Sequence, residues 1–126
     1  MARRDLTGAI DFAYLESYTA KDQDIIDEVL SLFREQARLW RRLLEPPEAT
    51  EGWRDAVHAL KGAAGSIGAR ALAQACAMAE QAPDGDGYDA ARSRGLSGVL
   101  DALDLVLADI AAYRHEQALK SLKGGG

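Results

Sequence analysis

The sequence predicts an all-α fold, an antiparallel four-helix bundle with a short additional N-terminal helix. Apolar residues recur at spacings of three and four along most of the chain, which is the period of an amphipathic helix. Ala and Leu dominate over Val, Ile and Thr, and the alternating pattern of a half-buried strand is absent. The three prolines leave room for long helices. Four substantial amphipathic segments joined by short links favour an antiparallel bundle.

The expected helices are separated by residues that end or cap helices. We expect helices at about residues 11–17, 22–44, 50–66, 69–81 and 88–119. Pro46 and Pro47 end the second of them. Thr50 is the expected N-cap of the third, and Gly68 marks a tight turn or a close helix contact after it. A loop at residues 83–87 precedes the last helix.

The apolar faces of the four long helices define the expected core. Its members are Ile26, Val29, Leu30, Phe33, Ala37, Trp40, Leu44, Trp53, Ala56, Leu60, Ala63, Ile67, Leu72, Ala75, Cys76, Ala79, Leu96, Val99, Leu100, Leu103, Val106, Leu107, Ile110 and Tyr113. Gly95 and Gly98 mark a candidate interruption of the last helix. The single cysteine, Cys76, excludes an intrachain disulfide and a cysteine-based zinc cluster, and it is expected to be a small buried apolar residue.

Length and charge restrict the domain organisation and the classes of function. The 126 residues fit one domain, in which we expect a flexible N-terminus at 1–9, a bundle at 10–120 and a disordered Gly-rich tail at 121–126. A net charge of −5 argues against nucleic acid, and no polybasic segment would attract an anionic membrane. No apolar run is long enough to span a bilayer, and no secretion signal is visible. The expected protein is a cytoplasmic monomer.

The segment from His58 to Gly68 carries the candidate chemistry. On a helix with about 100° per residue, the core positions of this segment lie opposite His58. Arg54, Lys61, Gly62 and Gly65 fall on the same side as His58. The histidine is therefore expected to point away from the core, among two cations and residues without bulky side chains.

Glycines on the face of His58 need an explanation, because each costs about 1 kcal/mol relative to Ala inside a helix. Gly62 and Gly65 would leave the imidazole open to a bulky group or to the surface of another protein. Lys61, three residues after His58, would reach a dianionic phosphoryl group on the ring, and a neutral imidazole is a competent nucleophile. Taken singly, a surface histidine, a solvated lysine and packing glycines are ordinary features. Their presence together on one non-core face favours a functional site.

The run His58-Ala-Leu-Lys61-Gly62, followed by Gly68, resembles the signature of the histidine-containing phosphotransfer (HPt) domain family. That pattern is His-x-x-Lys-Gly, then small residues, then a Gly six positions after the first. The helices on both sides match the family as architecture, from about residue 10 to residue 118. Gly65 departs mildly from the pattern, since Ser or Ala is common at that position.

The resemblance implies a role for each matching residue. His58 would be the phosphoacceptor, Lys61 would contact the phosphoryl group, and Gly62, Gly65 and Gly68 are grouped as positions with an access or steric role at the histidine. A polar residue on the adjacent helix hydrogen-bonds the imidazole in related bundles, and alignment places Glu80 there.

The resemblance also implies the function and the partners. The protein would relay a phosphoryl group between receiver-domain aspartates and His58 in a multistep two-component phosphorelay, without kinase activity of its own. Its partners would be receiver domains of a hybrid histidine kinase, of a response regulator, or of both. It would carry no cofactor, because the partner receiver supplies Mg²⁺.

Other functions remain open at this stage. The first alternative is an interaction bundle that binds or sequesters a receiver domain and is never phosphorylated. The second is a fragment of a histidine kinase, whose dimerisation helix has an acidic residue after the histidine and a proline a turn later, where this chain has Ala59 and Gly62. His115 has no companion at metal-ligand spacing, so no metal site is expected. No Gly-rich phosphate-binding motif for ATP is present.

Overall fold

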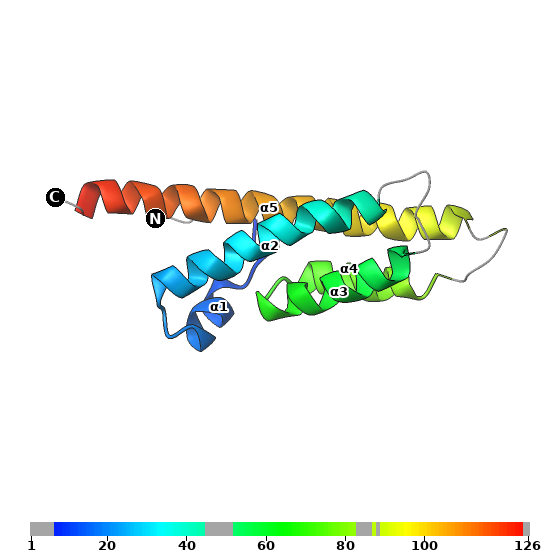
Figure 1. Ribbon diagram of the computed structural model, residues 1–126, viewed down its shortest axis with the longest axis horizontal. Helices are drawn as coiled ribbons and strands as arrows, with labels where there is room; N and C mark the ends of the chain where they lie inside the picture. Colours follow the sequence, from blue (N-terminus) through cyan, green and yellow to red (C-terminus); the bar gives the residue numbers. More distant parts are fainter. Residues whose placement is uncertain (1–6, 45–51, 83–86, 88, 125–126) are drawn as a thin grey trace.

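The computed structural model describes residues 7–44, 52–82, 87 and 89–124, and all regular structure in these ranges is helical (Figure 1). The helices are α1 (Phe12–Tyr18), α2 (Gln23–Leu44), α3 (Trp53–Ser66), α4 (Arg70–Glu80) and α5 (Asp89–Gly124). The predicted all-α fold and the positions of the five expected helices are therefore confirmed.

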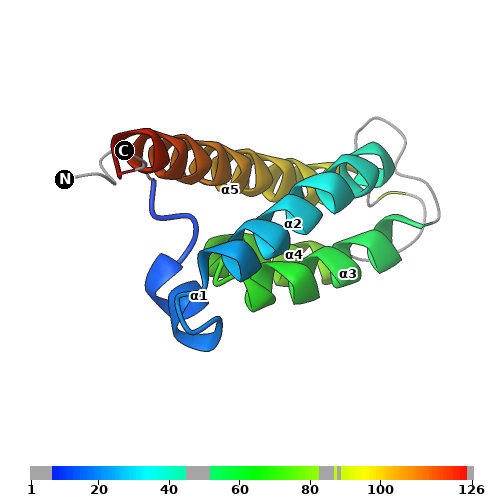
Figure 2. The same cartoon turned by 60° about the vertical axis from the view of Figure 1, so that its left-hand side comes forward.

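Helices α2 to α5 form a closed four-membered bundle. Helix α3 packs against α2 and α4, and α5 packs against α2 and α4 on the other side. Successive helices run in opposite directions (Figure 1), and α1 lies at the end of the bundle where α2 begins (Figure 2). This is the antiparallel bundle with a short additional helix that the sequence predicts.

The core consists of the predicted apolar faces with a few additions. Every residue of the expected core is either buried or packed against the buried cluster. Val57 and Ala64 of α3 are fully buried as well, because α3 lies between α2 and α4 and its buried face is wider than one stripe. Helix α1 contributes Phe12, whose ring stacks on Tyr113 with centroids 4.5 Å apart. Cys76 is buried, as expected, and burial raises the pKa of its thiol to about 12.

Two helix ends differ from the sequence-based expectation. Helix α3 begins at Trp53 with Gly52 as its N-cap, which offers no side chain to cap it, and the expected cap Thr50 lies outside the described residues. Helix α5 continues to Gly124, so residues 121–124, assigned to a disordered tail, are helical, while 125–126 lie outside the described residues. Nothing between Leu119 and the glycines breaks a helix, because Lys, Ser and Leu are all acceptable in it.

Helix α5 is also uninterrupted at its two internal glycines. At Gly95, a Cβ would lie 3.2 Å from the Cα of Ala79, so the missing side chain lets α5 approach α4 closely. At Gly98, a Cβ would meet nothing within 4 Å. The expected interruption is therefore wrong, and at Gly95 the reason for the glycine is helix packing.

The segment before α1 is held by a buried carboxylate of α5. Asp109 is fully buried, and its two oxygens accept hydrogen bonds from the backbone N–H of Thr7 at 2.6 Å and of Ala9 at 2.9 Å. Residues 7–9, which we expected to be part of a flexible N-terminus, are thus bound to α5, while residues 1–6 lie outside the described part. The partners of Asp109 are backbone amides, which leave no mark in the sequence.

The turn between α3 and α4 determines which residues of the two helices meet. His58 precedes the end of α3 by eight residues, and Glu80 lies ten residues after the start of α4. At 1.5 Å per residue these positions are about 12 Å and about 15 Å from the turn, so the antiparallel pair brings them to the same level. None of the described helices is long and apolar enough to cross a membrane.

Candidate functional site

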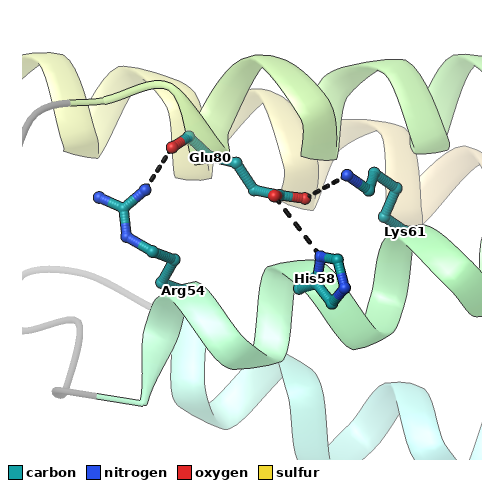
Figure 3. Close-up of polar contacts among 4 residues, drawn as sticks. All are labelled: Arg54, His58, Lys61 and Glu80. Carbon is teal, nitrogen blue, oxygen red and sulfur yellow. Dashed lines mark hydrogen bonds and ion pairs between the residues drawn. The ribbon is translucent and has the colours of Figure 1, made fainter.

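His58 lies on the exposed face of α3, as the helical pattern predicts. Its side chain is 72% exposed, whereas Val57 and Leu60 on either side of it in the sequence are completely buried. The ring faces the C-terminal end of α4 (Figure 3). An exposed imidazole on a rigid helix can receive a reacting group without any rearrangement of the core.

Glu80, the last residue of α4, contacts both His58 and Lys61. One carboxylate oxygen, Oε2, lies 3.5 Å from His58 Nδ1, and the other, Oε1, lies 2.8 Å from Lys61 Nζ (Figure 3). The structure thus brings together the three polar side chains that the sequence singled out. The second ring nitrogen, Nε2, points away from Glu80 (Figure 3).

The electrostatics of this cluster keep Glu80 ionised. The hydrogen bond from Lys61 is the largest cause that lowers the pKa of Glu80, and the charge of Lys61 and the contact with His58 act in the same direction. Partial burial opposes them by penalising the charged form. The result is a carboxylate anion that faces one nitrogen of the histidine and one ammonium group.

Gly62 and Gly65 leave the surface beside His58 open. A Cβ at either position would meet no atom within 4 Å, so packing does not require these glycines. Both are exposed on α3, one and two turns after His58. Their conformational cost is therefore not offset by contacts within the described chain.

Gly68 differs from Gly62 and Gly65, because it is closely packed. It lies in the turn after α3 with φ +74, and a Cβ there would be 3.0 Å from the backbone oxygen of Asp11. Its carbonyl accepts a hydrogen bond from the backbone N–H of Asp11 at 2.9 Å. The grouping of Gly68 with the access positions is therefore corrected: at the far end of α3 it permits a turn and the close approach of the segment that caps α1. The prediction of a tight turn or close contact at Gly68 is confirmed on both counts.

Arg54, one turn before His58 on α3, binds the main chain at the C-terminal end of α4. Its Nη1 donates to the carbonyl oxygen of Glu80 (Figure 3), and its Nη2 donates to the carbonyl oxygen of Ala82 at 2.8 Å. Its guanidinium also lies over the ring of Trp53, 4.6 Å from the centroid. The sequence placed Arg54 on the face of His58 but gave it no partner, since backbone carbonyls have no signature of their own.

No metal centre accompanies this cluster in the described ranges. Among these residues no group of three or more His, Cys, Asp and Glu is arranged to hold a metal ion. Glu80 is the one carboxylate that contacts His58 among the described ion pairs, and Lys61 already occupies its other oxygen.

The fold and the site together define a class of protein. A helical bundle that presents an exposed histidine, with a lysine one turn away and bare glycines beside it, is the arrangement of a phosphoryl carrier.

Comparisons with known proteins agree. The model of the Hpt domain matches residues 15–115. The histidine phosphotransferase ShpA of Caulobacter crescentus is 51% identical, with a TM-score of 0.76 over 91% of this chain and 99% of that chain. A rice protein described as a putative histidine-containing phosphotransfer protein is 26% identical, with a TM-score of 0.52 over 86% of this chain and 76% of that one. No curated protein sequence matches the chain. The chain belongs to the Hpt domain family, and its role is phosphotransfer in a phosphorelay.

Proposed function

We propose that Nε2 of His58 is the atom that accepts the phosphoryl group from an aspartyl phosphate of a receiver domain and later returns it to a receiver aspartate. The observation that carries this proposal is the orientation of one highly exposed ring. Nδ1 faces a carboxylate, and Nε2 faces outward beside glycines that fill no space.

The contact with Glu80 favours the nucleophilic tautomer. A carboxylate beside Nδ1 favours the proton on that nitrogen, which leaves the lone pair on Nε2. During transfer the Nε2 lone pair forms the N–P bond, while the bond between phosphorus and the aspartate oxygen breaks and leaves its electron pair on that carboxylate. Since Nδ1 keeps its proton, the ring becomes cationic, and the anion of Glu80 faces this new charge. The corresponding role of the aspartate in a Ser-His-Asp triad is well established.

Lys61 supplies positive charge on the face of α3 that carries His58. In the unphosphorylated protein its ammonium is paired with Glu80 at 2.8 Å. A dianionic phosphoryl group on Nε2 would compete for this ammonium, because it carries more charge than the carboxylate. Gly62 and Gly65 supply the room for that group and for the surface of the receiver.

The partner carries the remaining chemistry. Phosphoryl transfer relies on positioning and on cations that neutralise the transferring group, and the receiver would bring the Mg²⁺ that does this. We infer that the chain is a monomeric carrier without kinase activity, with the receivers of a hybrid histidine kinase and of a response regulator as its two exchange partners. Incubation with ATP and Mg²⁺ alone should therefore leave it unlabelled, and labelling without any kinase would contradict the carrier role.

The test uses the two histidines of the chain, His58 and His115. Receiver domains of the source organism, each phosphorylated with ³²P, are incubated with the wild-type protein, with His58→Gln and with His115→Gln. His115 is exposed on α5, so His115→Gln is the matched control. We expect acid-labile label on the wild type and on the control, and none on His58→Gln, whose melting temperature should be unchanged because the replaced ring is exposed.

Two outcomes would reject the proposal. Acid-labile label that persists on His58→Gln would place the acceptor elsewhere. Stable binding of a phosphorylated receiver without any label on the wild type would favour the interaction bundle that only sequesters its partner.

A further inference from the structure

Three side chains of α3 converge on a single residue of α4. Arg54, His58 and Lys61 follow one another at intervals of four and three residues, so they lie on one face of the helix. All three contact Glu80: Arg54 through the backbone carbonyl, His58 and Lys61 through the carboxylate (Figure 3). Glu80 is thus held at its main chain and at its side chain by the same helix.

The contact of Arg54 with the main chain supplies hydrogen-bond donors to carbonyl groups at the C-terminal end of α4. The last carbonyls of a helix have no partner within it, and they carry the negative end of the helix dipole. In α4, the carbonyls of Met78 and Ala79 accept from the backbone N–H of Gln81 and Ala82 at 3.2 Å and 3.1 Å. The carbonyl of Glu80 and that of Ala82 accept from Arg54 instead. The planar guanidinium offers two donors at a fixed spacing, which an ammonium does not.

Arg54 is itself fixed. It lies in the first turn of α3 and is partly buried. Its guanidinium lies over the ring of Trp53, a core residue that is only 5% exposed. The arginine therefore packs on a core residue at the start of α3 and binds the carbonyl oxygens at the end of α4. Helix ends fray where their carbonyls have no partner, and the carboxylate that faces His58 belongs to the last residue of α4.

We propose that Arg54 is a positioning residue for phosphotransfer: by binding the carbonyl oxygens of Glu80 and Ala82, it fixes the carboxylate of Glu80 against Nδ1 of His58. It acts on the reacting nitrogen only through Glu80 and does not touch the phosphoryl group. The inference rests on the proposed role of His58, and it assigns to Arg54 a function separate from the stability of the bundle.

The test compares Arg54→Ala and Arg54→Lys with a control at Arg70. Arg70, on the same helix as Glu80 but at its start, pairs with Asp11 at 2.9 Å and is 73% exposed, so Arg70→Ala removes a surface arginine far from the site. The first readout is the tautomer of His58 from the ¹⁵N shifts of its ring, measured without any phosphoryl donor. We expect Nδ1–H in the wild type and in Arg70→Ala, and a mixture of tautomers in Arg54→Ala.

The second readout is the rate of phosphotransfer from a ³²P-labelled receiver. Because one charged hydrogen-bonding group is lost and its effect is indirect, we expect Arg54→Ala to slow transfer about fivefold, with Arg54→Lys between it and the wild type. In the background of Glu80→Ala, which removes the carboxylate, Arg54→Ala should cause little further loss. If Arg54→Ala does not fold, Arg54→Lys decides by the same two readouts.

The outcomes separate this inference from the proposed function. An unchanged tautomer and an unchanged rate in the Arg54 variants would overturn the role of Arg54. So would a double variant whose loss of transfer rate equals the product of the losses in Arg54→Ala and in Glu80→Ala. A wild-type protein that accepts no label on His58 would overturn the proposed function, and the tautomer measurement would still report whether Arg54 positions Glu80.

Discussion

The glycines at the two ends of residues 62–68 show opposite uses of the same residue type. At Gly62, one turn from His58, an added Cβ would meet nothing within 4 Å. At Gly68, just past the helix, an added Cβ would lie 3.0 Å from the oxygen of Asp11, and the backbone has φ +74. The first glycine leaves a surface bare, and the second fits a backbone into a tight place.

This difference means that the residues of one sequence motif do not share one physical role. A substitution at the open end should change phosphotransfer with little effect on folding, whereas one at the turn should change folding. The predictions below test that separation, beginning with the largest expected effect.

Gly68→Ala should destabilise the protein by about 2 to 4 kcal/mol, because alanine is strained at positive φ and its Cβ would press on the backbone of Asp11. Urea unfolding of the variant and the wild type measures this loss. Gly65→Ala is the control, since its Cβ meets open space and alanine favours the helix by up to about 1 kcal/mol. Equal stability of the Gly68→Ala variant and the wild type would remove the distinction between the two ends.

Gly62→Gln should slow phosphotransfer roughly tenfold, because a side chain would obstruct the approach of the receiver to His58. The helix itself should gain up to about 1 kcal/mol from propensity. The measurement is the transfer rate together with the melting temperature. Gly98→Gln on α5 is the matched control, since a Cβ there also meets nothing within 4 Å. A raised melting temperature with an unchanged rate would show that Gly62 has no access role.

Lys61→Ala should shift the equilibrium between phospho-His58 and the phosphorylated receiver toward the receiver by about 1 kcal/mol, since the charge of a half-buried ammonium near a dianion is only partly screened. The stability should change by less than about 0.5 kcal/mol. The ratio of the two phosphorylated species, measured at several salt concentrations, should differ most at low salt. Lys120→Ala on α5 serves as a control. Equal ratios for Lys61→Ala and the wild type at every salt concentration would mean that Lys61 does not contact the phosphoryl group.

The smallest effect concerns the pH dependence of the Lys61–Glu80 pair. The pKa of Glu80 is lowered mainly by Lys61, so the folded state holds its proton less tightly than the unfolded chain. The stability from this pair is therefore present above the ordinary pKa of a glutamate and is lost as the pH falls through the lowered value. Lys61→Ala should raise the pKa of Glu80, as a ¹³C titration of its carboxyl carbon would show. An unchanged midpoint would indicate that the ion pair does not persist in solution.

The sequence predicted the parts of the site that side-chain periodicity and the family motif describe. His58 and Lys61 lie on an exposed face because Val57 and Leu60 are bound to the core, and this pattern is readable in the sequence. Glu80 was found through the family resemblance, because related bundles carry a polar residue beside the imidazole on the adjacent helix and alignment of the helix after Gly68 places Glu80 there.

The parts that could not be predicted depend on backbone partners. Arg54 binds carbonyls of Glu80 and Ala82, and Asp109 binds amides of Thr7 and Ala9. Backbone carbonyl and amide groups occur along the whole chain, so no residue type indicates these contacts. The sequence limited the role of Gly68 to a turn or a close contact, but its neighbour Asp11, the N-cap of α1, is 57 positions away in the sequence and is known only from the fold.

The buried carboxylate of Asp109 has a practical consequence for where the chain can be cut. Its two donors are the amides of Thr7 and Ala9, so the folded unit includes residues 7–9. A chain that started at residue 10 would lose both donors and leave a fully buried anion without them, a loss of the kind that costs 1 to 3 kcal/mol, roughly, for each unsatisfied group. A purification tag or a second protein should therefore be fused ahead of residue 7, where both amides are kept.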